Sequence, residues 1–200
     1  MRTILTAAAI GLVSALLVDA PAVSQDKSSW SDFLGPDLKG WSYLGTGKNP
    51  WKYTTDRVLS SESGTSRIAL DRELGDGMLH VEWRFRPDSG KKVFKASVSV
   101  RNEPGGASCK VALGENCGSI SATVVASSDR QKTIEEKAPK DHSLPVGEWN
   151  TLELKLEGRN VTAVVNGKVT TSFGQCDSDR GFAALEAEGC AIEFRKVMWK

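Results

Sequence analysis

The sequence predicts an all-β domain built as a sandwich of two antiparallel sheets. Short runs in which apolar and polar residues alternate recur along the chain, and this alternation is typical of strands with one buried face. Turn residues separate the runs about every ten residues, which is the spacing usual in sandwiches. Helix signals are few, apart from residues 129–137. Together these observations favour strands throughout most of the chain.

Size and charge are those of an ordinary single domain. The chain has 200 residues, 40% of them hydrophobic, and a formal net charge of +1. No block of like charge stands out, so we do not expect nucleic acid as a partner. A chain of this length can bury about 70% of the surface that it exposes when unfolded, which is enough for a core of its own.

The first segment, residues 1–24, predicts a signal peptide. A basic tip precedes the apolar run 4–18, and Ala22-Val23-Ser24 fits the small residues of a cleavage site. We therefore expect a secreted or periplasmic protein whose domain spans residues 25–200, with no stable membrane anchor after cleavage. An uncleaved anchor is the alternative, but the apolar run is shorter than the roughly 20 residues that cross a bilayer.

Cysteines predict disulfide bonds if the chain is exported, because export leads to oxidising surroundings. The chain has Cys109, Cys117, Cys176 and Cys190. Four cysteines allow three connectivities, and we favour the two local pairs, Cys109 with Cys117 and Cys176 with Cys190. A zinc site is the alternative, but neither spacing resembles the C-x-x-C pattern of zinc ligands.

Tryptophans mark the opening of the predicted domain. Trp30, Trp41 and Trp51 stand in an irregular stretch with Gly and Pro, and we expect them to cap one end of the sandwich. A platform on which a sugar stacks is the alternative. Short strands are predicted next, at 58–59 and 67–70.

The strand predicted at 78–86 separates apolar from polar side chains clearly. Successive strand side chains point to opposite faces of a sheet. One face carries Leu79, Val81, Trp83 and Phe85, and the other carries His80, Glu82, Arg84 and Arg86. The apolar face is predicted to form core, and the polar face to meet water or to carry chemistry.

The following strand, 94–101, alternates in the same way. Its polar face carries Ser97, Ser99 and Arg101. If this strand pairs with the preceding one, the polar side chains of both lie beside one another on a single sheet face. Such a face could hold a sugar in an extended groove.

Seven further strands are predicted, at 110–114, 119–125, 151–156, 161–165, 168–171, 181–189 and 191–199. Residues 127–145 form a long polar excursion with one predicted helical turn. Asn166-Gly167 predicts a two-residue type I′ hairpin turn, because both residues tolerate positive φ angles. Glu186 and Glu188 are expected at a strand end as turn formers. Trp83, Trp149 and Trp199 are expected in the core.

Several short motifs follow one another in a recognisable order. They are Phe33-Leu34-Gly35-Pro36-Asp37, Leu79-His80-Val81-Glu82-Trp83-Arg84, Gly147-Glu148-Trp149-Asn150, the Asn166-Gly167 hairpin, Leu185-Glu186-Ala187-Glu188-Gly189 and Ile192-Glu193-Phe194-Arg195. In this order the chain resembles the secreted 3-keto-disaccharide hydrolase domain family, also described as 3-keto-glucoside lyase and 2-hydroxy-glucal hydratase. The resemblance implies a concanavalin A-like jelly roll with a sugar on its concave face.

The resemblance also implies a glycoside or oligosaccharide substrate whose C3 hydroxyl is already oxidised. The ketone acidifies the C2 proton, so a base can start an elimination that breaks the glycosidic bond, while a cation or a divalent metal holds the developing enolate. Water then adds to the glucal. The predicted catalytic residues are Glu82, His80 and Arg101, and the predicted substrate-binding residues are Arg84, Ser97, Ser99, Lys110 and His142. The sequence identifies no ligands for a metal.

One departure from the family pattern bears on catalysis. Many relatives read N-S-G-[IV]-F-x-R and then Y-E-[VI]-Q, whereas this chain has Ser108-Cys109-Lys110-Val111 near the second motif. Lys110 thus stands where a glutamate is expected. The alternative function is therefore a non-catalytic carbohydrate-binding or adhesion module on the same fold, and a structural envelope protein without a ligand is a third interpretation.

Overall fold

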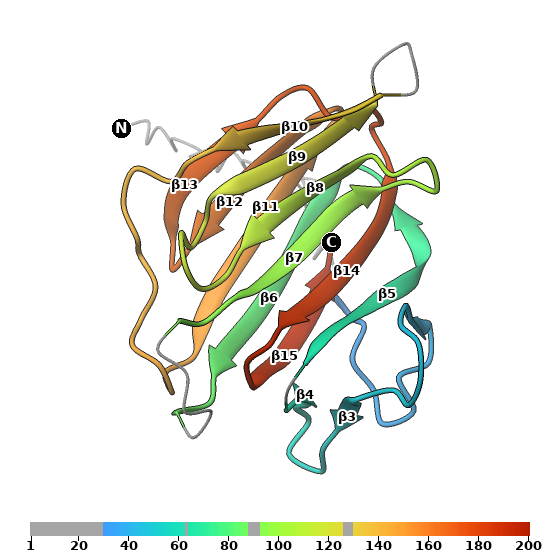
Figure 1. The fold of residues 1–200 in the computed structure, drawn as a ribbon, viewed down its shortest axis with the longest axis vertical. Helices are drawn as coiled ribbons and strands as arrows, with labels where there is room; N and C mark the ends of the chain where they lie inside the picture. Colours follow the sequence, from blue (N-terminus) through green and yellow to red (C-terminus); the bar gives the residue numbers. More distant parts are fainter. Residues whose placement is uncertain (1–29, 63, 88–92, 126–129) are drawn as a thin grey trace, which may run out of the picture.

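The computed structural model describes residues 30–62, 64–87, 93–125 and 130–200. These residues form fifteen strands in two antiparallel sheets that pack face to face (Figure 1). The predicted all-β sandwich is therefore confirmed. Among the described residues, no helix is long and apolar enough to cross a membrane. The predicted signal peptide lies outside the described residues.

The first sheet, sheet A, has the strand order β13-β12-β11-β6-β15-β4-β3, and β1 also pairs with β15. Its strands are β1 (Ser31–Asp32), β3 (Trp51–Tyr53), β4 (Leu59–Ser61), β6 (Gly77–Phe85), β11 (Asn150–Glu157), β12 (Asn160–Val165), β13 (Lys168–Phe173) and β15 (Ile192–Trp199). The turn between β12 and β13 has φ angles of 47° at Asn166 and 75° at Gly167, as a type I′ turn requires.

The second sheet, sheet B, has the strand order β10-β9-β8-β7-β14-β5-β2. Its strands are β2 (Trp41–Tyr43), β5 (Thr65–Leu74), β7 (Ala96–Asn102), β8 (Ser108–Ala112), β9 (Ile120–Val125), β10 (Gln131–Glu136) and β14 (Gly181–Glu188). The core lies between the two sheets and includes Leu79 and Val81 of sheet A and Val98 and Val111 of sheet B, each at most 1% exposed.

The expected pairing of the strands at 78–86 and 94–101 is wrong. β6 pairs with β11 and β15 in sheet A, whereas β7 pairs with β8 and β14 in sheet B. The chain crosses from one sheet to the other between β6 and β7, so the polar faces of these two strands lie on opposite outer faces of the sandwich. The apolar faces of both strands meet in the core, which is why each shows a clear alternation.

The helical turn expected near residues 129–137 is also wrong for the part that is described. Residues 131–136 form β10, an edge strand that pairs with β9 from Gln131 opposite Val125 to Glu136 opposite Ile120. Ile134 packs against the core. Backbone pairing with β9 and burial of the Ile134 side chain therefore outweigh the helical preference predicted for these polar residues.

The two predicted local disulfides are wrong, because the described residues contain neither of these bonds, and all four cysteines are buried. Cys109 lies opposite Ala122 in the pairing of β8 with β9, whereas Cys117 lies in the turn that connects these two strands. Cys176 and Cys190 flank the two ends of β14, so the length of that strand separates them. Burial raises the pKa of the Cys117 thiol to about 12. Contact with Cys176, together with burial, raises the pKa of Cys109.

Tryptophans divide between the core and the surface. Trp41, Trp51 and Trp83 are buried, with exposed fractions of 9%, 4% and 0%. Trp30 instead meets His80 edge to face on the outside of sheet A. Trp149, expected in the core, is only half-buried and lies between two arginines on the same outer face.

Candidate functional site on the concave face of sheet B

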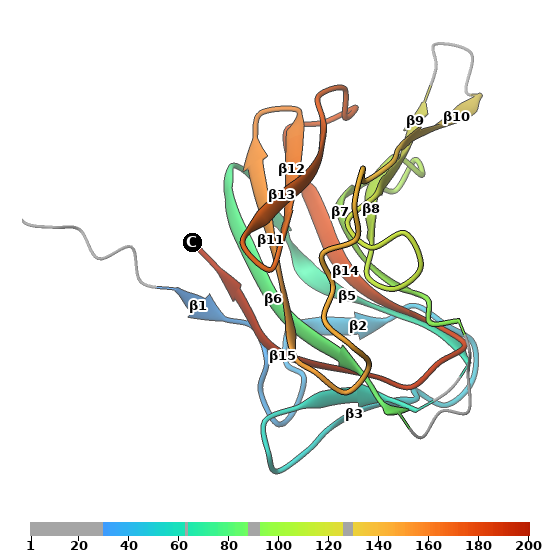
Figure 2. The same cartoon turned by 90° about the vertical axis from the view of Figure 1, so that its left-hand side faces the viewer.

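Both sheets are bent in the same sense, so that the outer face of sheet B is concave (Figure 2). Strand β14, which lies between β7 and β5 in this sheet, directs Leu185 and Ala187 into the core. Because strand side chains alternate, Glu186 and Glu188 project onto the concave face. Polar side chains of β5, β7 and β8 surround these two carboxylates.

Glu186 is held by cations and a hydroxyl from three neighbouring strands. Its Oε2 lies 2.6 Å from Lys110 Nζ, and its Oε1 lies 3.4 Å from Arg67 Nε. Ser99 Oγ donates a hydrogen bond of 3.1 Å to the same Oε1. The side chain of Glu186 is only 12% exposed. This carboxylate is thus neutralised and fixed before any ligand arrives.

Glu188, two positions further along β14, is much more open. Its side chain is 36% exposed, and its Oε1 lies 4.0 Å from Lys110 Nζ. Ser97 Oγ donates to Oε1 at 3.2 Å. Lys110 therefore lies between the nearly buried carboxylate of Glu186 and the more exposed carboxylate of Glu188, which we call the open carboxylate.

A hydrogen-bonded floor extends the polar face beyond Glu186. Arg67 Nη2 donates to Asn102 Oδ1 at 2.7 Å. Asn102 Nδ2 in turn donates to Ser99 Oγ at 3.1 Å and to the carbonyl oxygen of Phe182 at 2.8 Å. Side chains that are fixed by such a network present a preformed surface to a ligand.

A cavity of about 350 Å³ adjoins the open carboxylate on this face. Its lining includes Lys95, Ser97, Lys110, Ser121, Glu135 and Glu188. Such a mixture of hydroxyls, carboxylates and ammonium groups can hydrogen-bond the hydroxyls of a sugar.

Arg101, a predicted catalytic residue, does not reach this face. A bulge in β7 lets Ser99 pair with Ala184 and Asn102 with Phe182, so two residues of β7 oppose one of β14. Arg101 adopts a left-handed φ of 54° within the bulge. The bulge reverses the alternation, so Asn102 takes the place on the concave face that the sequence pattern assigned to Arg101.

The guanidinium of Arg101 is buried at one end of the sandwich. It donates to the carbonyl oxygens of Leu74, Gly75 and Gly158 at 3.0, 3.1 and 2.8 Å. Asp76 Oδ1 lies 3.4 Å from Nη2. Burial lowers the pKa of Arg101, and the charge of Asp76 partly offsets that effect. These contacts tie the β5–β6 and β11–β12 turns to β7.

Glu82, His80 and Arg84 gather on the outer face of sheet A, on the opposite side of the molecule. Glu82 accepts hydrogen bonds of 2.5 Å from Arg195 Nε and 2.6 Å from Lys196 Nζ. A bulge in β15, with a φ of 49° at Lys196, brings both cations to the same carboxylate. Glu82, His80 and Arg84 do not line the cavity beside Glu188.

Charge pairs also occupy the neighbours of Glu82. His80 lies between Glu82 and Glu153, with nitrogen–oxygen distances of 3.8 and 3.6 Å. Arg84 Nε contacts Glu193 Oε2 at 2.6 Å and stacks over the Trp149 ring at 4.5 Å. Burial disfavours the charged form of Glu82, but the hydrogen bonds from Lys196 and Arg195 outweigh burial, and the pKa of Glu82 lies below its ordinary value.

His142 lies in the connection between β10 and β11 and is half-buried. Its carbonyl oxygen accepts a hydrogen bond of 2.8 Å from Asn166 Nδ2. It lines neither the cavity beside Glu188 nor the face around Glu82. Of the predicted substrate-binding residues, Ser97, Ser99 and Lys110 therefore come together, whereas Arg84 and His142 lie elsewhere.

Glu186 and Glu188 are the residues that the sequence interpretation missed, because they were expected to act as turn formers. The signal was present in the alternation Leu185-Glu186-Ala187-Glu188, which matches a strand with one buried face. The described residues contain no group of three or more His, Cys, Asp or Glu side chains arranged to hold a metal ion.

The sequence matches the profile of one protein family along almost its whole length. The family is described as the 3-keto-alpha-glucoside-1,2-lyase-like domain, and the match covers residues 29–200. A comparison with curated proteins finds no match. Sequence similarity therefore points to a single family.

Solved structures share the fold at low sequence identity. A candidate glycosyl hydrolase from Parabacteroides distasonis is 19% identical, with a TM-score of 0.64 over 86% of this chain and 98% of that one. The β-glucanase of Bacillus licheniformis is 10% identical, with a TM-score of 0.58 over 86% and 95%. The carbohydrate-binding module CBM66 of Bacillus subtilis is 15% identical, with a TM-score of 0.57 over 79% and 93%. These likenesses establish the concanavalin A-like jelly roll.

Proposed function

Because the chain belongs to the family of 3-keto-alpha-glucoside-1,2-lyase-like domains, we propose that it cleaves 3-keto-glycosides on the concave face of sheet B. The observation that carries this proposal is the position of Lys110. Its Nζ lies 2.6 Å from Glu186 and 4.0 Å from Glu188, so a fixed cation stands beside an open carboxylate. An elimination next to a ketone needs these two groups, a base and a cation.

Glu188 is the proposed base. It removes the C2 proton of the oxidised sugar, and the electron pair of the C–H bond forms the C2–C3 double bond of an enolate whose charge lies on the C3 oxygen. The C3 carbonyl then re-forms, its electron pair moves into a C1–C2 double bond, and the C1–O bond breaks. The aglycone oxygen leaves with the electron pair of the C1–O bond and takes a proton from water, and the hydroxide so formed takes the proton held by Glu188. Addition of water to the glucal then completes a net hydrolysis. Lys110 donates to the C3 oxygen while that oxygen carries enolate charge.

Glu186 positions Lys110 and is not itself the base. Its Oε2 is occupied by Lys110, and its Oε1 by Arg67 and Ser99. With a side chain only 12% exposed, Glu186 has no oxygen open to a C2 proton. Removal of Glu186 would leave the ammonium group of Lys110 without its nearest partner and free to turn away from the cavity.

The test is to incubate the protein with 3-keto-trehalose or a 3-keto-glucoside and to follow glucose and 2-hydroxy-glucal by NMR. We expect Glu188→Gln and Lys110→Met each to lower turnover at least tenfold while the protein stays folded. Glu62→Gln is the matched control, because Glu62 is a surface carboxylate with a side chain 62% exposed. Unchanged turnover in Glu188→Gln would contradict the proposed base. A parallel sample with chelator tests for a divalent metal, which is required if product formation then stops.

A carbohydrate-binding module without catalysis is the second candidate. Lys110 favours it, because it replaces the glutamate expected in the family and forms an ion pair with Glu186. This candidate predicts saturable binding of a glycoside to the concave face without any product. Product formation by the native protein would exclude it.

We also propose that the protein acts after export, in the periplasm or outside the cell. The support is the predicted signal peptide, with its basic tip and apolar run. Mass spectrometry of the protein from fractionated cells would show an N-terminus near Gln25 in the exported fraction. A chain that stays in the cytoplasm with Met1 intact would contradict the proposal.

A further inference from the structure

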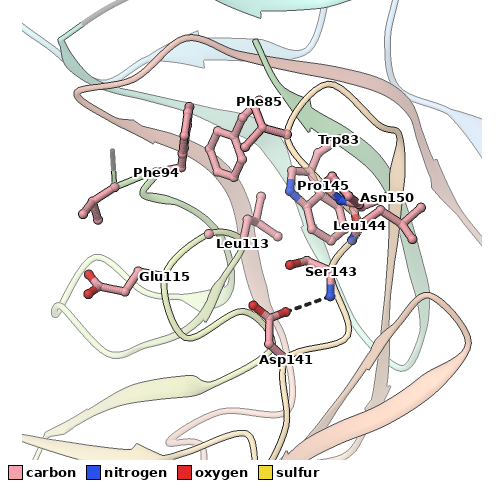
Figure 3. A pocket seen from close by; sticks show the side chains of 13 residues that line it. Trp83, Phe85, Phe94, Leu113, Glu115, Asp141, Ser143, Leu144, Pro145 and Asn150 are labelled. Atoms are coloured by element: carbon pink, nitrogen blue, oxygen red, sulfur yellow. Dashed lines mark hydrogen bonds between the residues drawn. The ribbon is translucent and has the colours of Figure 1, made fainter. Parts of the chain in front are cut away.

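A second cavity, of about 320 Å³, opens at the end of the sandwich where β6 ends and the β10–β11 connection crosses (Figure 3). Its walls include Trp83, Phe85, Phe94, Leu113 and Pro145. Eight of its thirteen lining residues are apolar, compared with two of the eleven residues that line the cavity beside Glu188. Cavities of this size and character are typical binding sites for small ligands.

The rim of this apolar cavity exposes large hydrophobic side chains. Val93, Leu144 and Val146 are 52%, 48% and 42% exposed. Only two other large hydrophobic residues of the described chain, Leu44 and Val169, are comparably exposed. Exposed apolar side chains that cluster around one opening are typical of a binding surface, whereas single exposed apolar residues are common on any protein surface.

An unpaired donor lies in the wall of the cavity. Trp83 is fully buried, and its indole Nε1 has no hydrogen-bond partner among the described residues. A buried N–H group without an acceptor is energetically unfavourable, and such a group in a native protein calls for an explanation. A ligand oxygen that accepts from this nitrogen would satisfy it.

Other polar groups of the lining are already engaged with the protein. Asn150 Oδ1 accepts from the amide of Leu144 at 2.6 Å and from Asn166 Nδ2 at 2.9 Å. Asp141 Oδ1 accepts from the amide of Ser143 at 2.7 Å. The indole N–H of Trp83 is thus a donor in the wall of the cavity that has no acceptor among the described residues.

The apolar cavity adjoins the polar one. Glu115 lines both, and its ion pair with Lys95, at 3.0 Å, lies at their common border. Both side chains of this pair are about half exposed. The amide of Glu188 donates to the carbonyl oxygen of Lys95 at 3.2 Å, so the open carboxylate stands at the end of β14 nearest this border.

We propose that the apolar cavity binds the aglycone of the glycoside whose sugar occupies the concave face. The inference rests on the proposed function. The substrate class is then glycosides with an apolar aglycone of about one aromatic ring, which carries an oxygen that accepts from Trp83. The sugar lies beside Lys110 and Glu188, and the bond that breaks lies near the Lys95–Glu115 border.

The experiment compares 4-methoxyphenyl glucoside, whose ring carries an acceptor oxygen, with methyl glucoside as binding probes. We expect 4-methoxyphenyl glucoside to bind at least tenfold more tightly by calorimetry and to shift the NMR signal of the Trp83 indole N–H, whereas methyl glucoside leaves that signal in place. Leu144→Asp puts a charge on the rim and should abolish the tenfold preference. Val169→Asp is the matched control, because Val169 is 65% exposed and does not line the cavity.

Failure of this inference can be told apart from failure of the proposed function. Equal binding of the two glucosides and an unmoved Trp83 signal overturn the aglycone site, whatever the turnover of 3-keto-glucosides. A Trp83 signal that responds to 4-methoxyphenyl glucoside in the native protein, but not in Leu144→Asp, supports the site. If such a protein cleaves no 3-keto-glucoside, the proposed catalysis fails and the aglycone site stands as part of a binding module.

Discussion

Two glutamates show how surroundings assign different roles to the same side chain. The side chain of Glu82 is 9% exposed and accepts from two cations within 2.6 Å, whereas that of Glu188 is 36% exposed, with a cation 4.0 Å away. A carboxylate closed by two cations is a poor base, because its charged form is strongly stabilised. We therefore propose that Glu82 stabilises sheet A and that Glu188 is the base.

Glu82→Gln should accordingly lower the free energy of unfolding by about 1–3 kcal/mol, because it leaves Arg195 and Lys196 without their shared acceptor charge. Turnover of a 3-keto-glucoside should stay within a factor of two. Urea titration and the NMR assay measure the two effects separately. A tenfold loss of turnover without a loss of stability would contradict this expectation and would support a catalytic role for Glu82.

The stabilisation by Glu82 should depend on pH in a defined direction. The pKa of its carboxyl group lies below the ordinary value of 4.5, so the folded state holds the proton less tightly than the unfolded state does. The stability advantage of the native protein over Glu82→Gln is therefore complete above pH 4.5 and shrinks as the pH falls towards the folded-state pKa. An advantage that grew on acidification would contradict this account.

Bulges are the element-level features that decide which residues meet. In β7 the bulge turns Arg101 away from the concave face, and in β15 another bulge aims Arg195 and Lys196 at Glu82. Each bulge shifts the alternation of its strand by one residue. A strict period of two, applied to the sequence, therefore assigns the residues beyond a bulge to the wrong face.

Arg101→Met should destabilise the protein by about 2 kcal/mol or more, because it leaves the carbonyl oxygens of Leu74, Gly75 and Gly158 without their donor. Thermal and urea unfolding measure the loss. Arg57→Met is the matched control, since Arg57 also has a positive φ, of 60°, but an exposed side chain. Equal effects of the two substitutions would show that backbone strain, and not the buried hydrogen bonds, sets the result.

Local features of the fold could be predicted from the sequence, whereas the pairing of distant strands could not. Alternation located β6 and β7, and Asn166-Gly167 located the turn between β12 and β13, because both signals involve neighbouring residues. The partners of β6 are β11 and β15, which lie far along the chain and leave no mark in its own sequence.

The candidate site was predictable in part for the same reason. Ser97, Ser99 and Lys110 were predicted as substrate-binding residues, and they lie together because β7 and β8 are consecutive paired strands. Glu186 joins them only through the pairing of β14 with β7, a contact between distant parts of the chain. Glu82 and His80 were grouped with them through a pairing that does not form.

At the scale of the whole molecule, the sandwich is held together by its core and not by cross-links. The two sheets bury apolar faces against each other, and the four cysteines lie within that core without the two predicted disulfide bonds. A chain of about this size buries enough surface to be stable without disulfides. Stability should therefore be insensitive to reducing agents.

Thiol reactivity tests this view directly. In the folded protein all four cysteines are buried, which keeps a reagent in solution away from their sulfur atoms, and burial raises the pKa of Cys117 to about 12. A thiol reagent should consequently react slowly with the folded protein and rapidly with four equivalents in denaturant, and dithiothreitol should leave the melting temperature unchanged. Fewer than four reactive thiols in denaturant, together with a lower melting temperature after reduction, would show that the protein isolated from its host carries a disulfide. Cys109 and Cys176 would then be the first pair to examine, because they are in contact across the core.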